Sequence, residues 1–371
     1  MMRNVLLTLL LLSCLPGWAA RASSRIFVPA TDPAIQYFGR WDMSDSLHAR
    51  YSWPGVFLYA EFSGTSLGIR VADGTNYFNV FIDGALRKFF HGTSPRETDY
   101  VLIDGLEEGH HTVLLGRRNI TFDEVYSFSG FLLDSGATLL PAPPKPARKI
   151  EFIGDSFTAA ESNEATEEEL PWEARFPVTN IDKGFASFIA QHFKAQYMTT
   201  CRSGSGMVCD WKGNMRESIP ARYDRTLMDT SLPKWDFKQW IPNVVVICLG
   251  LNDLTGLREK DGTVSTENSA LFRQTYHSFI STIRGVYPGV KIVAVAAFPE
   301  WIRKNVKQVI DEERSAGHKD IFYTQFDEFP GGYVANGHPT VVTHRMMANQ
   351  IIEAMQSFNL FPAAKGEASK P

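Results

Sequence analysis

The sequence predicts a two-domain α/β protein with an N-terminal β-sandwich and a doubly wound parallel-sheet domain behind it. Three observations lead to this prediction. Short runs rich in β-branched and aromatic residues, separated by turn signals, occupy residues 25–140. A proline-rich linker follows at 141–147. From 148 to 361, strand-like apolar runs alternate with runs of helical periodicity, which is the pattern of a parallel sheet with crossover helices.

Composition limits the classes of function. The chain has 371 residues, and its 44% of hydrophobic and 12% of aromatic residues suffice for two hydrophobic cores. The formal net charge is −4, so no basic face is expected to attract nucleic acid. The sequence contains no CxxC motif or Cys/His cluster, so no structural metal and no cofactor are expected.

Residues 1–22 are predicted to be a secretory signal peptide. Arg3 precedes a short apolar run at 5–12, and Ala20-Arg21-Ala22 provides a small-residue cleavage site. The run is too short to span a bilayer, so the protein is expected to be secreted, periplasmic or at the cell surface. Two alternatives remain: a buried N-terminal element, and a lipid anchor at Cys14, where the preceding residues resemble a bacterial lipobox imperfectly.

The first domain is predicted to be a β-sandwich or jelly roll. About seven short strands are expected within ~115 residues, a density typical of these folds. Asp83-Gly84 predicts a tight hairpin, because this pair tolerates the positive φ values of a type I′ turn. The clearest strand-like runs are 56–62, 67–71, 77–82, 100–103, 111–115 and 131–133.

The second domain is predicted to be flavodoxin-like, with a five-stranded parallel sheet. Strands that are apolar throughout, such as Val244–Ile247, are typical of a sheet covered on both faces. The tail at 362–371 is expected to be disordered. The predicted strands are 150–153, 197–200, 244–249, 290–296 and 321–324, and the predicted helices are 185–193, 272–286 and 340–358.

The segment 149–158, KIEFIGDSFT, is the first candidate for chemistry. Its apolar strand stops at Gly154-Asp155-Ser156, and a serine at such a strand end is presented at the rim of the sheet. A serine hydroxyl needs a base to become a nucleophile, and its oxyanion product needs preorganised hydrogen-bond donors. The histidine of His338-Pro339 can supply the base, and the Ser203–Gly206 loop and Asn252 can supply donors.

These pieces resemble the four sequence blocks of the SGNH (GDSL-like) hydrolases, in order. The front domain also resembles the jelly-roll half of carbohydrate esterase family 2, and the likeness covers about residues 37–360. It implies an esterase that removes O-acetyl groups from polysaccharides such as acetyl xylan or glucomannan. The motifs of the front domain that carry the likeness are Trp53-Pro54-Gly55, Phe62–Leu67, Val80–Gly84 and Gly130–Asp134.

The resemblance also implies roles for individual residues. Ser156 is expected to be the nucleophile and His338 the base. Gly204 and Asn252 are expected to complete the oxyanion hole with the backbone N–H of Ser156. Gly206 is the alternative to Gly204, and His344 is the alternative base, although it lies inside the last predicted helix.

One position departs from the family pattern, in which an aspartate shortly precedes the histidine. The matching residue is Asn336, and Ala335 precedes it. Asparagine carries no charge, so it would stabilise an imidazolium less than a carboxylate does. Some relatives in the resembled family use a Ser–His dyad with a backbone carbonyl in the orienting role, so the resemblance implies this arrangement for His338, with Asn336 as a helper. Asp327 or Glu328 remains the alternative orienting acid.

Other residues receive structural predictions. Asp155 is expected to bond loop amides and Asp253 to cap a helix. The acidic segment 161–173 is expected to be a solvated loop, with a role in substrate binding as the alternative. Ser156 itself has the alternative of a helix N-cap. Cys201 and Cys209 flank the glycine-rich loop, so a disulfide and two buried thiols are equally open alternatives.

Substrate contacts and two other functional classes complete the set of hypotheses. Trp301 is expected to line the cleft, because sugar rings stack on aromatic faces, and Trp211 and Tyr333 are alternatives. An SGNH lipase or thioesterase would require a long apolar groove. A non-catalytic carbohydrate-binding protein would have lost part of the site, yet all four blocks are complete.

Overall fold

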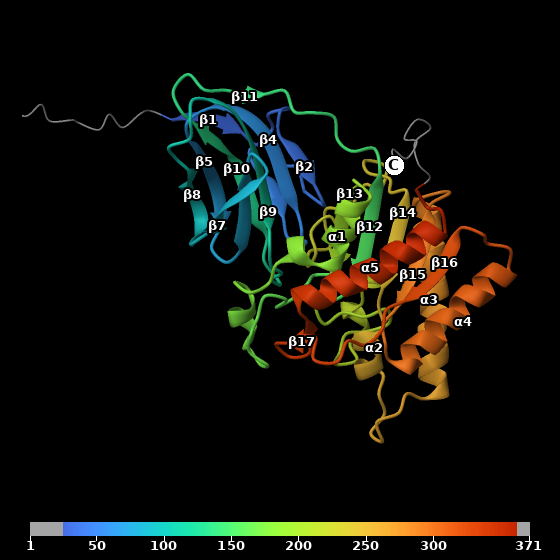
Figure 1. Ribbon diagram of the computed structural model, residues 1–371. Coiled ribbons are helices and arrows are strands. Elements are labelled where there is room, and N and C mark those ends of the chain that lie inside the picture. The colour runs from blue at the N-terminus through green and yellow to red at the C-terminus, as the bar shows by residue number, and fades with distance from the viewer. Residues whose placement is uncertain (1–24, 362–371) are drawn as a thin grey trace, which may run out of the picture.

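The computed structural model describes residues 25–361 (Figure 1). The predicted signal peptide at 1–22, the lipid-anchor alternative at Cys14 and the predicted tail at 362–371 lie outside these residues. Within the described range, no helix combines the length and apolarity needed to cross a membrane.

The N-terminal part is a sandwich of two antiparallel sheets, which confirms the predicted fold. One sheet has the order β1-β10-β5-β8, with β3 paired to β10; the other has the order β11-β4-β9-β6-β7, with β2 paired to β4. The strands are β1 (Ile26–Pro29), β2 (Gln36–Phe38), β3 (Ala49–Tyr51), β4 (Phe57–Gly64), β5 (Leu67–Asp73), β6 (Tyr77–Ile82), β7 (Ala85–His91), β8 (Ser94–Ile103), β9 (Gly109–Arg117), β10 (Tyr126–Leu133) and β11 (Leu139–Leu140).

Local sequence explains most of these strands. Burial alternates strictly along β4, because one face covers the core and the other is partly exposed. Ile82 pairs with Ala85 across the predicted hairpin, and Asp83 and Gly84 have φ values of 54° and 75°, as a type I′ turn requires. The short strands β1, β2, β3 and β11 were not predicted, since runs of two to four residues carry little pattern.

The C-terminal part is built on a five-stranded parallel sheet, as predicted. Its order is β13-β12-β14-β15-β16, which is the flavodoxin-like arrangement. The order reverses between β12 and β14, and ligands bind such sheets in the crevice at the carboxyl ends of these two strands. The strands are β12 (Lys149–Gly154), β13 (Gln196–Cys201), β14 (Val244–Cys248), β15 (Lys291–Ala296) and β16 (Ile321–Gln325).

Helices flank the parallel sheet (Figure 1), with α1 packed against α5 and α3 packed against α4. The α-helices are α1 (Phe185–His192), α2 (Leu251–Gly256), α3 (Thr266–Val286), α4 (Glu300–Ser315) and α5 (Val341–Ser357). The loops contain four short 3₁₀ helices: η1 (Trp172–Arg175), η2 (Ile181–Lys183), η3 (Met215–Glu217) and η4 (Pro220–Arg222). They also contain a hairpin formed by β17 (Tyr333–Val334) and β18 (His338–Pro339). The sequence did not predict α4, and a helix near α2 was expected only as the one that Asp253 would cap.

A buried ion pair connects the sandwich to the parallel sheet. Arg40 is fully buried, and its guanidinium lies 3.1 Å from the carboxylate of Glu151 in β12. It also donates hydrogen bonds to the backbone carbonyls of Tyr223 and Arg225, at 2.5 and 2.8 Å. Because both charges are removed from water, the loss of either partner would leave an uncompensated buried charge and lower the stability of the fold.

Candidate active site

Ser156 lies in a tight turn that follows β12. A Cβ atom at Gly154 would approach Thr158 Oγ1 to 1.9 Å and the Cys248 carbonyl to 2.9 Å, so only glycine fits at the strand end. The chain then turns helically, and the Glu161 N–H donates to the Ser156 carbonyl at 3.0 Å. Ser156 is 9% exposed, just past the carboxyl end of β12, which lies between β13 and β14 in the sheet.

His338 lies beside this turn, at the β17–β18 hairpin. Its ring centroid is 6.2 Å from that of Phe157, the residue after Ser156. Its Nδ1 is 2.8 Å from the carbonyl oxygen of Ala335. Since a carbonyl can only accept, Nδ1 carries the proton of the neutral ring, and Nε2 is left as an acceptor. A base with this tautomer can take a proton from a hydroxyl.

The Asn336 side chain makes no hydrogen bond to the imidazole. Its side-chain oxygen accepts a hydrogen bond from the Leu170 N–H at 3.2 Å instead. Ala335, Asn336 and Gly337 all have positive φ values, of 33°, 65° and 82°. The hairpin that presents His338 is therefore held in a conformation that is costly for residues with a side chain.

The other proposed bases and orienting acids lie elsewhere. His344 is fully buried in α5, its Nδ1 accepts from the Phe185 N–H at 3.3 Å, and burial lowers its pKa to about 3. Asp327 is exposed and accepts a hydrogen bond from Gln350 at 2.9 Å. The carbonyl of Ala335 occupies the Nδ1 side of His338, which is where an orienting acid would lie.

The loop after β13 is anchored by a buried carboxylate. Asp253 accepts hydrogen bonds from the N–H groups of Met207, Val208 and Cys209, at 2.7, 2.6 and 3.3 Å. The expectation that Asp253 caps a helix was wrong, because its side chain points into this loop. Burial raises its pKa to about 6 although the three N–H groups favour the charged form.

Two glycines suit this loop for different reasons. Gly204 has a φ of +79°, a conformation that residues with a Cβ rarely adopt. At Gly206, a Cβ atom would lie 2.3 Å from the carboxylate of Asp253. Gly206 is therefore needed for the approach of Asp253, and Gly204 shapes the part of the loop that leads from β13.

Asn252 connects this loop to the turn of Ser156. Its side-chain amide donates to the Ser205 carbonyl at 3.0 Å and to the Asp155 carboxylate at 3.4 Å. Asp155 also accepts from the Phe157 N–H at 3.0 Å, which confirms its predicted structural contact. Burial raises the pKa of Asp155 to about 7. The residues expected to form the site thus come together at one rim of the sheet.

Comparisons with known proteins agree with this arrangement. A model of the carbohydrate esterase 2 N-terminal domain matches residues 37–143. The chain is 32% identical over 331 residues to the cellulase/esterase CelE of Acetivibrio thermocellus, covering 86% of this chain but 39% of CelE. It is 28% identical over 313 residues to an acetylxylan esterase/glucomannan deacetylase of Cellvibrio japonicus, covering 82% of this chain and 85% of that protein.

A solved structure extends the likeness to both domains. The family two carbohydrate esterase from Clostridium thermocellum, in complex with cellohexaose, is 28% identical and has a TM-score of 0.79, with 88% of this chain and 100% of that chain covered. The chain belongs to carbohydrate esterase family 2. The likeness spans the sandwich and the parallel sheet, so the family assignment applies to both parts of the described chain.

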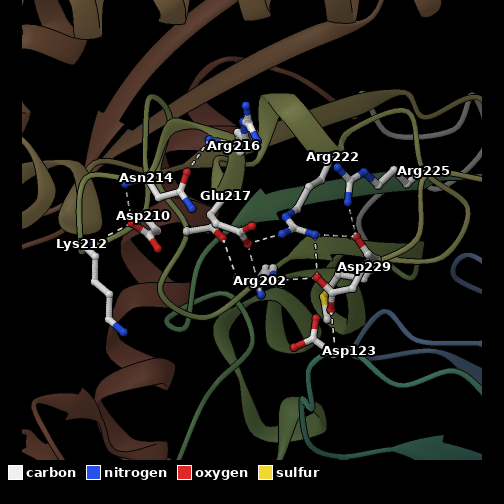
Figure 2. A network of polar contacts seen from close by, with 12 residues as sticks. Asp123, Arg202, Asp210, Lys212, Asn214, Arg216, Glu217, Arg222, Arg225 and Asp229 are labelled. Carbon is white, nitrogen blue, oxygen red and sulfur yellow. Dashed lines mark hydrogen bonds and ion pairs between the residues drawn. The ribbon is translucent and has the colours of Figure 1, made fainter.

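A network of ion pairs surrounds Arg202 (Figure 2). Arg202 directly precedes the loop, and it pairs with Asp229 at 3.1 Å and with Glu217 at 3.4 Å. Arg222 pairs with the same two carboxylates, at 2.6 Å for Asp229. The backbone N–H of Asp123, from the sandwich, donates to Asp229 at 3.1 Å. These contacts fix the start of the loop to both domains.

The aromatic candidates differ in their surroundings. The indole N–H of Trp301 donates to Ser269 at 2.9 Å, and its ring packs 4.9 Å from that of Phe272, between α4 and α3. Trp211 is 53% exposed, and its ring approaches the Cβ position of Gly204 to 3.1 Å. Tyr333 packs on Phe157, with centroids 6.3 Å apart. Trp211 therefore offers the more accessible ring beside the glycine-rich loop.

Sequence reasoning missed Glu161, which belongs to the segment expected to be solvated. Glu161 is 2% exposed, and its carboxylate lies 3.9 Å from Nε2 of His338. Arg175 donates to the same carboxylate at 2.7 Å. Glu164 is also engaged, in an ion pair with Lys183 at 2.6 Å, whereas Glu167–Glu169 are exposed as expected. In the sequence, the only indication that Glu161 lies near the site is its position five residues after Ser156.

The cysteines of the described residues are free. Cys201, Cys209 and Cys248 are all buried, so the buried-thiol alternative holds and the disulfide does not form. Burial raises the pKa of Cys209 to about 12, which keeps it a thiol. Between residues 25 and 361, no group of three or more His, Cys, Asp or Glu side chains could hold a metal ion.

Proposed function

We propose that this chain is a serine esterase that removes O-acetyl groups from polysaccharides or oligosaccharides, using a Ser156–His338 dyad. The observation that carries the proposal is the hydrogen bond from His338 Nδ1 to the Ala335 carbonyl, with the ring beside the Ser156 turn. This contact leaves Nε2 as the acceptor that a dyad needs.

The mechanism follows from these positions. His338 Nε2 takes the proton of the Ser156 hydroxyl as the oxygen attacks the acetyl carbonyl. The oxyanion that forms is stabilised by the N–H groups of Ser156 and Gly204 and by the amide of Asn252, which exchanges its long 3.4 Å contact with Asp155 for the oxyanion. The imidazolium then gives its proton to the sugar oxygen, which leaves, and a water molecule releases acetate by the same steps. The dyad differs from a triad because a carbonyl dipole, not a carboxylate, orients the base.

The substrate class rests on the relatives and on the exposed aromatic ring. The relatives named above include esterases that act on acetylated xylan and glucomannan, and one solved structure contains cellohexaose. Trp211 lies exposed next to Gly204, where a sugar ring that carries the acetyl group can stack. Trp301 is half-buried between two helices, so we propose Trp211 for this contact.

Acetate release from acetylated xylan and glucomannan tests the proposal. Ser156→Ala and His338→Gln are each expected to lower kcat by ~10³-fold or more. The wild-type protein should also hydrolyse p-nitrophenyl acetate much faster than p-nitrophenyl octanoate. If Ser156→Ala releases acetate at the wild-type rate, the proposal is wrong; if octanoate is the better substrate, the lipase alternative replaces it.

We also propose that residues 1–22 direct export of the enzyme, on the basis of the sequence pattern. Cell fractionation of the full-length chain tests this proposal, and retention of residues 1–22 on cytoplasmic protein would contradict it. Labelling with a radioactive fatty acid separates the secreted form from a form anchored at Cys14, because only the anchored form incorporates the label.

A further inference from the structure

Glu161 is a buried carboxylate that the dyad mechanism leaves unused. It lies one helical turn after the nucleophile, and its backbone N–H donates to the Ser156 carbonyl at 3.0 Å. Glu161 therefore belongs to the same turn that presents the Ser156 hydroxyl. The carboxylate reaches to 3.9 Å from Nε2 of His338, the nitrogen that accepts the serine proton.

Arg175 holds this carboxylate in place. Its Nη1 donates to Glu161 at 2.7 Å, and its Nε donates to the Leu170 carbonyl at 3.0 Å. The same loop also supports the hairpin of His338. The Ala335 N–H donates to the Glu167 carbonyl at 2.8 Å, and the Asn336 N–H donates to the Glu168 carbonyl at 2.7 Å. The segment between Glu161 and Arg175 thus contacts both members of the dyad.

We propose that Glu161 is a positioning residue that supplies, from the Nε2 side, the negative charge that the dyad lacks on the Nδ1 side. The proposal rests on the proposed function. During acyl transfer the serine proton moves to Nε2 and then to the sugar oxygen, while Glu161 stays ionised and accepts no proton. The Glu161 carboxylate lies 3.9 Å from Nε2 in a buried site, so its full negative charge stabilises the transient imidazolium. This stabilisation is larger than that provided by the dipole of a backbone carbonyl.

Arg175 opposes this effect, because its positive charge partly neutralises Glu161. Two other titratable groups face the pair. Asp155 comes from the turn after β12, and its charge has the same sign as that of Glu161. His344 comes from α5, and since burial lowers its pKa to about 3, it is uncharged in the range of activity. The net field at His338 therefore depends on the balance between Glu161 and Arg175.

This balance makes two variants behave in opposite ways. Glu161→Gln should lower kcat about tenfold and move the acid limb of the kcat/KM profile to lower pH by roughly one unit, because the imidazolium is less stabilised. Arg175→Gln should move the same limb to higher pH, because Glu161 is no longer neutralised. KM for p-nitrophenyl acetate should change less than about twofold in both variants.

Matched controls separate this role from a structural one. Glu173→Gln removes an exposed carboxylate of the same loop and should leave kcat and the pH profile unchanged. Glu161→Asp keeps the charge, so it should restore most of the acid-limb position even where kcat stays low. A structural role would lower kcat in both Gln variants without moving the limb in opposite directions.

The proposal has a second measurement that does not depend on activity. In a Ser156→Ala background, the NMR titration of the His338 imidazole should move to lower pH with Glu161→Gln and to higher pH with Arg175→Gln. If Glu161→Gln does not fold, Glu161→Gln/Arg175→Gln, which removes both charges, is titrated in its place. Unchanged titrations, or shifts in one direction, overturn the proposal. Loss of activity in Ser156→Ala together with unchanged Glu161 variants would reject this inference alone.

Discussion

Replacing Arg40 by methionine tests the buried connection between the two domains. The guanidinium is fully buried and pairs with Glu151 at 3.1 Å, and it lies 5.1 to 5.6 Å from the centroids of four aromatic rings. Without it, Glu151 keeps only the hydroxyls of Thr200 and Tyr223, at 2.6 and 3.0 Å. An uncompensated buried charge costs about 3–5 kcal/mol.

The carbonyls of Tyr223 and Arg225 also lose their donor, and each unsatisfied buried group adds about 1 kcal/mol or more. Methionine recovers part of the packing against the rings. The free energy of unfolding is therefore expected to fall by about 4 kcal/mol. Urea unfolding followed by tryptophan fluorescence measures this loss. The matched control is Arg87→Met, which changes an exposed arginine of β7 and should stay within about 0.5 kcal/mol of wild type.

The double variant Arg40→Met/Glu151→Gln gives the sharper result. Because it removes both charges, it should be more stable than Arg40→Met by about 2 kcal/mol, so the two changes must be non-additive. The reasoning is refuted if Arg40→Met costs less than about 1 kcal/mol, or if the double variant loses the sum of the two single losses.

Three further predictions follow from the site. With p-nitrophenyl acetate as substrate, Asn336→Ala should lower kcat less than about tenfold, whereas His338→Ala should lower kcat by ~10³-fold or more. Equal losses of kcat would contradict a dyad oriented by a carbonyl. Gly206→Ala should lower kcat by ~100-fold through its clash with Asp253, and a fully active variant would show that the loop position is not needed. Burial raises the pKa of Asp155 from 3.8 to about 7, so this group stabilises the folded state fully below about pH 4 and loses that effect as pH rises to about 7. Asp155→Asn should flatten the pH dependence of Tm in this interval, and an unchanged slope would mean that Asp155 ionises normally.

The sequence predicted those parts of the fold that depend on local pattern. The continuous apolar run of β14 predicted a buried strand. The Asp83-Gly84 pair predicted a hairpin turn, because both residues tolerate positive φ values. Helix α4 was missed although Ile302, Val306 and Val309 are buried at helical spacing. The sequence of α4 consists mainly of charged and polar residues, so its few apolar positions give only a weak helical periodicity.

The candidate site shows the same division. Ser156, Gly204 and Asn252 were predicted as site residues because they follow strands in the order that a parallel sheet requires. Glu161 and Arg175 were not found, since nothing in a sequence fixes which acid of a charged loop becomes buried. The role of Asp253 as a loop anchor was missed for a related reason: its three N–H donors come from residues more than forty positions earlier.

The sandwich contacts the candidate site on two sides. On one side, Asp123 bonds Asp229, which pairs with Arg202 at the start of the glycine-rich loop, and Phe122 lies 4.2 Å from the Arg202 guanidinium. On the other side, Arg118 from the end of β9 pairs with Glu164, in the loop that begins at Glu161. Both the glycine-rich loop and the loop that begins at Glu161 are therefore held by contacts with the sandwich, so loss of these contacts should change the shape of the candidate site.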